Sequence, residues 1–232
     1  MTATNAIASF LTQFEIEILV VIAVAILEAI TKIPRRYVKY VYYRLSGKPF
    51  RIEVAFHRTY KGTMDSAFNS EIVRILFEQS DSNVLRKEVL QPHFLSIWSE
   101  KLGMTVSASL EEEIENEENY SEQTAILGYN IVIKHDAEMR GFNGVNDVHE
   151  FVTLATKLER IIAEQCFQES NVEPNYVVCD VKDYISKPIS MHLTDEKRSA
   201  EISIHDKVLT IKSSEPHDLP KLLSHYLIRF SA

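Results

Sequence analysis

An uninterrupted apolar run near the N-terminus places the strongest constraint on what this chain can fold into. The ten residues Ile18–Leu27 are all apolar, and the wider segment Phe14–Ile33 has 20 residues. A helix of about 20 residues is about 30 Å long, which matches the hydrocarbon core of a bilayer. The sequence therefore predicts a transmembrane anchor helix within residues 1–33.

Acidic residues within this predicted helix leave its mode of insertion open. Glu17 lies near one end and Glu28 near the other, where Lys32 follows at the favourable i+4 spacing. Charged groups cost less near the interface than at the bilayer centre, so a spanning helix with a local ion pair is one interpretation. A self-associating or bundled helix with Glu17 and Glu28 facing inward is the second, and a helix lying on the membrane surface is the third. We expect a homo-oligomer, or another membrane protein as the partner.

Basic and aromatic residues follow the anchor in a juxtamembrane collar, residues 34–49. Residues 32–61 carry nine Lys or Arg against one Glu, a net charge of +8, although the whole chain has −8. Tyrosine rings favour the headgroup level, and cations favour the cytoplasmic leaflet. The collar predicts contact with the lipid bilayer and, because it directly follows an apolar span, argues against nucleic acid as a partner. Its lipid-facing candidates are Arg35, Arg36, Tyr37, Lys39, Tyr40, Tyr42, Tyr43 and Arg44.

The orientation follows from the order of these segments. Positive charges come after the apolar run rather than before it, which is unlike a cleavable signal peptide. The positive-inside rule places the N-terminus outside and the remaining chain inside. Cys166 and Cys179 are too few for a disulfide framework and agree with a reducing compartment. The expected location is the cell membrane, with a single pass and a cytoplasmic C-terminal domain.

Residues 50–232 predict an α+β domain. Strand patterns cluster between helical ones instead of alternating strictly with them, which favours a mostly antiparallel sheet with helices packed on one face. The clearest helix is expected at 146–165, behind an Asn146 or Asp147 cap. The other expected helices are 69–78, 84–102 and 219–230, and the expected strands are 51–60, 104–110, 125–134, 176–181, 189–193, 200–204 and 208–212.

Two segments within this order of predicted elements show a weak similarity, which is called the echo below. Ile131–Lys134 ends in Ile-Lys and leads to the helix at Asp147, and Leu209–Lys212 ends in Ile-Lys and leads to the helix at Asp218. Either a strand–strand–helix unit is duplicated, or generic residues coincide.

Local motifs for chemistry are scarce. The eight histidines form no zinc-binding spacing, and the chain has no nucleophile-elbow motif, so we expect no catalytic residues, no metal and no cofactor. The best candidate for a small ligand is a loop before the predicted helix, where Arg140, Gly141 and Gly144 can hold an anion; the alternative is a plain flexible loop. Seven glutamates between 111 and 122 predict a solvated loop, or docking onto a basic surface.

These observations favour a membrane-anchored binding, scaffold or sensor domain that self-associates through its N-terminal helix. The alternative is a membrane-tethered enzyme that acts on a phosphorylated or nucleotide-like ligand near Gly141–Gly144, and a third possibility is a structural assembly subunit. A deep pocket that gathers Arg140, histidines and carboxylates would favour the enzyme. A flat sheet face would favour binding.

Overall fold

The computed structural model describes residues 41, 50–80, 85–114, 126–141, 143–167, 171–185, 190–196 and 199–230. The predicted anchor, with Glu17 and Glu28, and every named residue of the collar lie outside these ranges, so both stay predictions. Within them, no helix combines the length and the hydropathy that a membrane crossing needs. Contacts divide the chain into two units, Met1–Gly47 with His225–Ala232, and Lys48–Ser224. The sheet belongs to the second unit.

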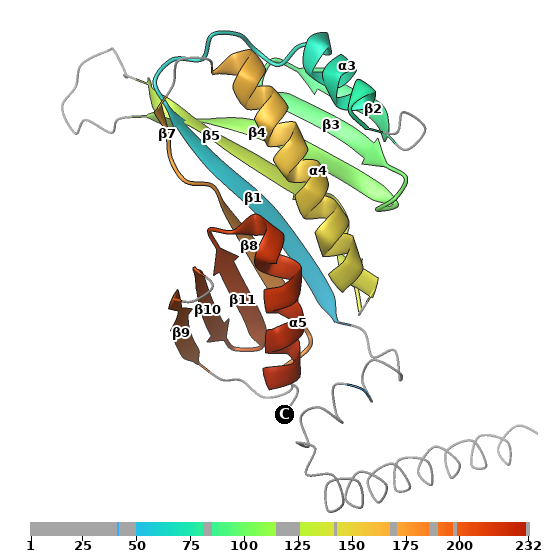
Figure 1. Cartoon of the computed structure of the whole chain (residues 1–232), viewed down its shortest axis with the longest axis vertical. Coiled ribbons are helices and arrows are strands. Elements are labelled where there is room, and N and C mark those ends of the chain that lie inside the picture. Colours follow the sequence, from blue (N-terminus) through green and yellow to red (C-terminus); the bar gives the residue numbers. More distant parts are fainter. Residues whose placement is uncertain are drawn as a thin grey trace, which may run out of the picture. The chain divides into compact units, whose positions relative to one another are not determined.

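The second unit is an α+β fold built on a mostly antiparallel sheet, as predicted (Figure 1). Nine of its strands follow the order β2-β3-β4-β5-β1-β8-β11-β10-β9, and every neighbouring pair is antiparallel. The strands are β1 (Arg51–Lys61), β2 (Leu85–Gln91), β3 (Phe94–Ser99), β4 (Met104–Ile114), β5 (Ile126–His135), β8 (Tyr176–Lys182), β9 (Met191–Asp195), β10 (Ala200–His205) and β11 (Val208–Ser213).

Strand β1 lies at the centre of the sheet and contributes several buried side chains to the core. Ile52, Val54 and Phe56 are buried on one of its faces because side chains alternate along a strand. Phe56 stands opposite Ile133 of β5 and Val177 of β8. Two short strands extend the pairing at the ends of β1, namely β6 (Met139–Arg140) at Arg51–Ile52 and β7 (Asn171–Val172) at Tyr60–Lys61.

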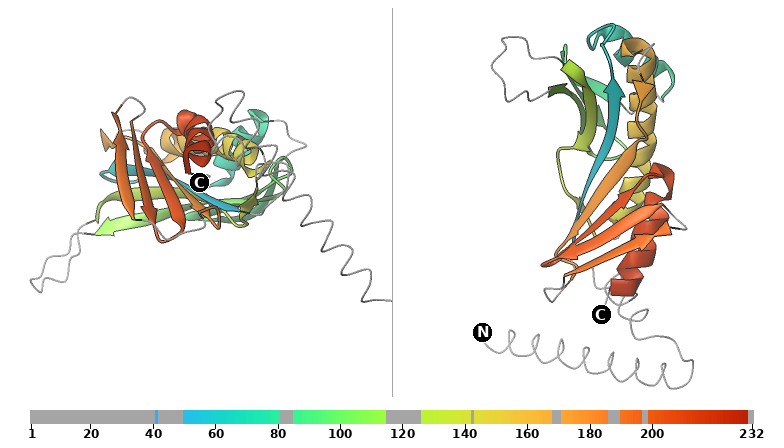
Figure 2. Two further views of the ribbon diagram at one scale, coloured as in Figure 1. Left: turned by 90° about the horizontal axis from the view of Figure 1, so that it is seen from below. Right: turned by 90° about the vertical axis from the view of Figure 1, so that its left-hand side faces the viewer.

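The helices cover one face of this sheet (Figure 2). Helix α3 (Ser70–Glu78) begins where the Asn69 side chain accepts a hydrogen bond from the Glu71 amide. Helix α4 (Asn143–Cys166) crosses the sheet and buries Val148, Phe151, Val152, Ala155 and Leu158, which recur at helical spacing. Helix α5 (Leu219–Phe230) follows a short 3-10 turn, η2 (Pro216–Asp218), and buries Leu219, Leu222 and Leu223.

Three sequence predictions need correction. The helix expected at 84–102 is wrong, because the chain forms the β2–β3 hairpin there, with Pro92 in its turn and Leu95 and Ile97 buried on one side. Helix α4 begins at Asn143 rather than behind a cap at Asn146 or Asp147. The acidic run was expected to be a loop, but its first residues, Glu111–Glu113, continue β4 opposite Asn130–Gly128.

The two halves of the sheet have similar strand orders when they are followed outward from β1 and from β8. From β1 the order is β5, β4, β3, β2, and from β8 it is β11, β10, β9, so the first half has one strand more. In each half the last strand of a meander pairs with the first strand, and a long helix follows. The two echoing sequences, Ile131–Lys134 and Leu209–Lys212, lie in β5 and β11, which occupy equivalent places in this order.

Candidate functional site

Backbone hydrogen bonds hold the predicted anion loop in place. Gly141 adopts a φ of 62°, and its amide donates to the Phe50 carbonyl at 2.9 Å. The Gly144 amide donates to the Gly141 carbonyl at 3.1 Å. Two amides that the sequence offered to an anion are therefore engaged within the chain. Arg140 is exposed, and the anion-binding role of Arg140, Gly141 and Gly144 stays a prediction.

The structure gives Gly144 a packing role. A Cβ atom at this position would lie 3.0 Å from the Met139 Cβ atom and 3.2 Å from the Ile52 Cδ1 atom. The absence of a side chain lets the first turn of α4 approach β1 and β6 closely. This close packing by itself explains why position 144 is a glycine, and no ligand is needed to account for it.

Charges beside the loop are largely paired. Arg51, which stands opposite Arg140 in the β1–β6 ladder, contacts Asp183 at 2.8 Å and Glu138 at 3.2 Å. Its guanidinium is thus neutralised by two carboxylates, and Arg140 is the cation nearest to the glycines in sequence.

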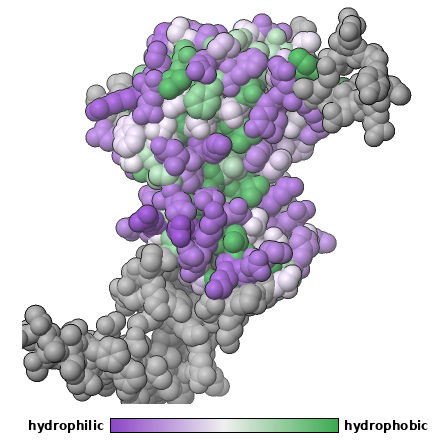
Figure 3. Space-filling view, turned by 180° about the vertical axis from the view of Figure 1, so that it is seen from behind, coloured by the Kyte–Doolittle hydropathy of each residue, from purple (hydrophilic) through white to green (hydrophobic). Residues whose placement is uncertain are grey.

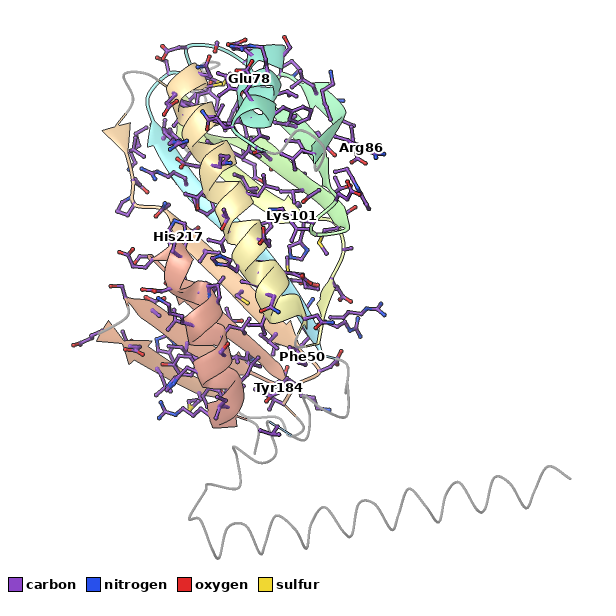
Figure 4. All side chains as sticks on the ribbon, turned by 45° about the vertical axis from the view of Figure 1, so that its right-hand side comes forward. Phe50, Glu78, Arg86, Lys101, Tyr184 and His217 are labelled. Atoms are coloured by element: carbon purple, nitrogen blue, oxygen red, sulfur yellow. The ribbon has the colours of Figure 1, made fainter. Side chains whose placement is uncertain are left out.

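Phe50 and Tyr184 close this end of the sheet with an edge-to-face contact at 5.2 Å (Figure 4).

His135 bridges a gap in the pairing of β1. Strand β5 pairs with β1 from Ala55 onward, and β6 resumes at Ile52, so the Val54 amide has no ladder partner on this side. The His135 Nε2 atom accepts this amide at 2.9 Å, and its Nδ1 atom faces the Ala137 carbonyl. The ring also meets Phe151 edge-on at 5.3 Å. These contacts require a neutral imidazole with its proton on Nδ1.

This geometry makes stability depend on pH. Burial lowers the pKa of His135 below its ordinary value and outweighs the opposing effects of the Ala137 carbonyl, Glu53 and Asp136. The folded chain then binds this proton more weakly than the unfolded chain, so the stabilisation is complete above about pH 7 and is lost as pH falls from about 6.5 toward the lower pKa of the folded chain. Part of this loss is the Val54 hydrogen bond, which a protonated Nε2 atom cannot accept, and an unsatisfied buried amide costs about 1–3 kcal/mol. Denaturation midpoints between pH 7.5 and pH 5 will show the decline.

A matched pair of variants checks the assignment to His135. His135→Gln keeps an acceptor for Val54 but does not titrate, so it should flatten the decline. His205→Gln, at an exposed position of β10, should leave it unchanged. A decline of equal steepness in His135→Gln would assign the effect elsewhere, with His57 the next candidate because burial also lowers its pKa.

The second sheet face, called here the uncovered face, has no described helix over it. Its side chains alternate with the core residues and include His57 of β1, Asn130 of β5, Tyr176 of β8 and Thr210 of β11. In Figure 3 apolar side chains run through the middle of the described surface on this side, between hydrophilic margins.

Contacts on the uncovered face order its rings. The His57 ring stacks on Tyr176 with centroids 4.9 Å apart, and the Lys212 ammonium lies 4.7 Å above the Tyr176 ring. Within the part of the chain that the structure describes, the buried His57 Nδ1 and Asn130 Oδ1 atoms have no hydrogen-bond partner. Charged side chains of the neighbouring strands share this face, among them Glu53, Lys134, Asp180, Lys182 and Lys212.

A buried polar cluster under α4 escaped the sequence analysis. The Glu159 carboxylate, 5% exposed, accepts a hydrogen bond from the Tyr60 hydroxyl and lies 3.4 Å from the Arg58 Nε atom. Burial and the neighbouring carboxylate raise the pKa of Tyr60. The sequence did contain a signal for this cluster, because Glu159 is a charged residue on the apolar stripe of the helix, four residues after Ala155. The cluster lies between the sheet and α4, so its charges are shielded from solvent and depend on one another for partners.

Two hollows lie elsewhere in this unit. A cavity of about 180 Å³ lies between the end of α3, the β2–β3 hairpin and α4. A shallow groove of about 650 Å³ follows the first turns of α4 and α5, along Asp147, His149, Glu150 and Lys221. Neither lining includes Arg140. Over the described ranges, no three histidine, cysteine or acidic side chains stand close enough together to hold a metal ion.

Comparison with models of known protein families gave no match, and comparison with curated proteins gave none either.

Proposed function

We propose that this chain is a membrane-anchored binding or scaffold domain that presents the uncovered face of its sheet to a partner in the cytoplasm. The carrying observation is that face, with its stacked His57 and Tyr176 and with no described helix over it. An antiparallel sheet with one solvated face usually alternates apolar and charged residues. Here the stacked rings of His57 and Tyr176 interrupt the charged residues, and the Lys212 ammonium lies over the Tyr176 ring.

The sequence supplies the rest of the proposal. The apolar segment Phe14–Ile33 crosses the cell membrane once, the collar contacts the cytoplasmic leaflet, and the acidic domain remains inside. Glu17 and Glu28 mark the face through which copies of the chain associate. The enzyme alternative has less support, because the amides of Gly141 and Gly144 are engaged within the chain.

A photoreactive residue placed on each side of the sheet tests this proposal in cells. At Thr210, on the uncovered face, we expect discrete cross-linked species from the membrane fraction. At Lys221, on the exposed side of α5, we expect none. An adduct of twice the chain mass that disappears in Glu17→Leu/Glu28→Leu would assign self-association to the anchor, provided that it persists in Glu15→Leu, which changes the third acidic residue of the same segment.

Two outcomes would count against the proposed function. Equal cross-linking at Thr210 and Lys221 would show that the uncovered face has no special role. Recovery of the chain in the soluble fraction would remove the anchor from the proposal.

The matching strand orders also support an internal duplication. It would comprise a first strand, a meander that returns to it and a long helix, with β1–α4 and β8–α5 as the two copies. This unit is longer than the strand–strand–helix echo in the sequence.

A further inference from the structure

The small cavity beside α4 combines hydrogen-bond donors from three elements. Ser80 follows α3, Ser99 ends β3, Lys101 lies in the turn after β3, and Lys157 comes from the middle of α4. Figure 4 shows Lys101 beside α4, on the hairpin side of the helix. These residues are distant in sequence and belong neither to the uncovered face nor to the 140–144 loop.

Lys157 contributes a charge and a spare donor. Its Nζ atom donates to the Gln79 carbonyl at 2.8 Å and to the Ser80 Oγ atom at 3.2 Å. A lysine ammonium has three N–H groups, and its contacts with the described residues use two of them, which leaves one for a ligand. Because Gln79 closes the C-terminal end of α3, the same contact offsets the negative end of that helix.

Ser99 is the most enclosed donor of the cavity. Its side chain belongs to a residue that is only 3% exposed, and its Oγ atom accepts a 3.4 Å hydrogen bond from the Leu102 amide. The hydroxyl proton therefore remains to donate. A hydroxyl held at this depth fixes the position of an acceptor more closely than a surface side chain does.

Lys101 brings the second charge and is free to adjust. Its Nζ atom lies 3.9 Å from the Glu150 carboxylate, beyond hydrogen-bond distance, and its side chain is 61% exposed. Among the described residues that line the cavity, Lys101 and Lys157 carry two positive charges against the one negative charge of Glu150.

We propose that this cavity binds the phosphate group of a small phosphorylated molecule. Two lysines and two serines from three parts of the fold line the cavity, and their N–H and O–H groups can serve the several acceptor oxygens of a tetrahedral phosphate. A carboxylate has only two oxygens in one plane and would leave donors unpaired. The volume of about 180 Å³ is below the roughly 300–1,000 Å³ of pockets for drug-sized ligands, so the ligand is small. This site does not rest on the binding role of the uncovered face.

Titration of the full-length chain in detergent with inorganic phosphate tests the site. We expect saturable heat of binding and a phosphate-dependent rise in melting temperature. Lys101→Gln should weaken binding about tenfold, which corresponds to one lost charge-assisted contact. Lys207→Gln, an exposed lysine in the β10–β11 turn, serves as the matched control and should change nothing. Acetate should bind more weakly than phosphate.

Three results would overturn the proposal. One is the absence of saturable binding at millimolar phosphate. Another is equal weakening by Lys101→Gln and Lys207→Gln, which would indicate a general charge effect. The third is acetate binding as tight as phosphate binding, which would indicate an unspecific anion site. Lys101→Gln is chosen over Lys157→Gln because Lys157 also caps α3, and its loss would confuse binding with folding.

Discussion

Replacing Glu159 by leucine is expected to lower the free energy of unfolding by about 3 kcal/mol. The substitution removes the carboxylate that pairs with Arg58 and accepts from Tyr60, and it leaves the guanidinium without its counter-charge under α4. Breaking a buried ion pair from one side typically costs about 3–5 kcal/mol. The lower end applies because the Arg58 side chain is 26% exposed. Denaturation of the full-length chain, followed by the fluorescence of Trp98, the one tryptophan in the sequence, measures the loss.

Two further variants distinguish the contribution of the Arg58–Glu159 ion pair from the effect of placing a leucine on α4. Glu164→Leu changes an acidic residue on the exposed side of α4, whose carboxylate lies 3.9 Å from Arg160, and should cost less than about 0.5 kcal/mol. Arg58→Met/Glu159→Leu removes both charges and should recover much of the stability lost in Glu159→Leu, since apolar packing can replace a buried pair. If Glu159→Leu is as mild as Glu164→Leu, the cluster does not stabilise the fold.

Gly128→Ala is expected to be the most damaging methyl addition in the sheet. The new Cβ atom would lie 2.4 Å from the backbone carbonyl oxygen of Tyr60 and 3.2 Å from the Lys61 Cα atom. Backbone atoms of a paired strand cannot rotate away, so β5 and β1 must separate locally. We expect a loss of about 3 kcal/mol, at the upper end of the usual cost of overpacking. Faster hydrogen exchange of the amides near Lys61 would locate the separation.

Gly103→Ala provides the contrasting case. Gly103 has open space around it but a φ of 64°, so alanine there suffers backbone strain without a clash, and about 1 kcal/mol is expected. A smaller loss for Gly128→Ala than for Gly103→Ala would mean that the β1–β5 pairing adjusts easily.

Much of the fold is predictable from local patterns, as particular elements show. The helix expected at 219–230 coincides with α5, and β1, β8 and β11 lie within a residue of their expected bounds. The β2–β3 hairpin was missed because its apolar residues do not alternate clearly, and their burial depends on Val106 and Ala108 of the neighbouring β4.

The functional sites were less predictable, for a physical reason. The anion loop was proposed from residues adjacent in sequence, but the amides there are engaged by Phe50 and by the loop itself. The uncovered face and the cavity with Lys101 and Lys157 arise only when distant strands and helices meet. No local spacing identifies them.

The central position of β1 and β8 has a consequence for the order of folding. All pairings of the first half, from β1 to β5, are complete once α4 has been synthesised, whereas the second half joins through contacts such as Arg51–Asp183, 132 positions apart. Distant contacts form slowly because the intervening chain must first be closed into a loop. During synthesis, the edge of β1 that later receives β8 therefore stays unpaired while the first half is already assembled, and in that interval the growing chain is most prone to pair with the wrong strand.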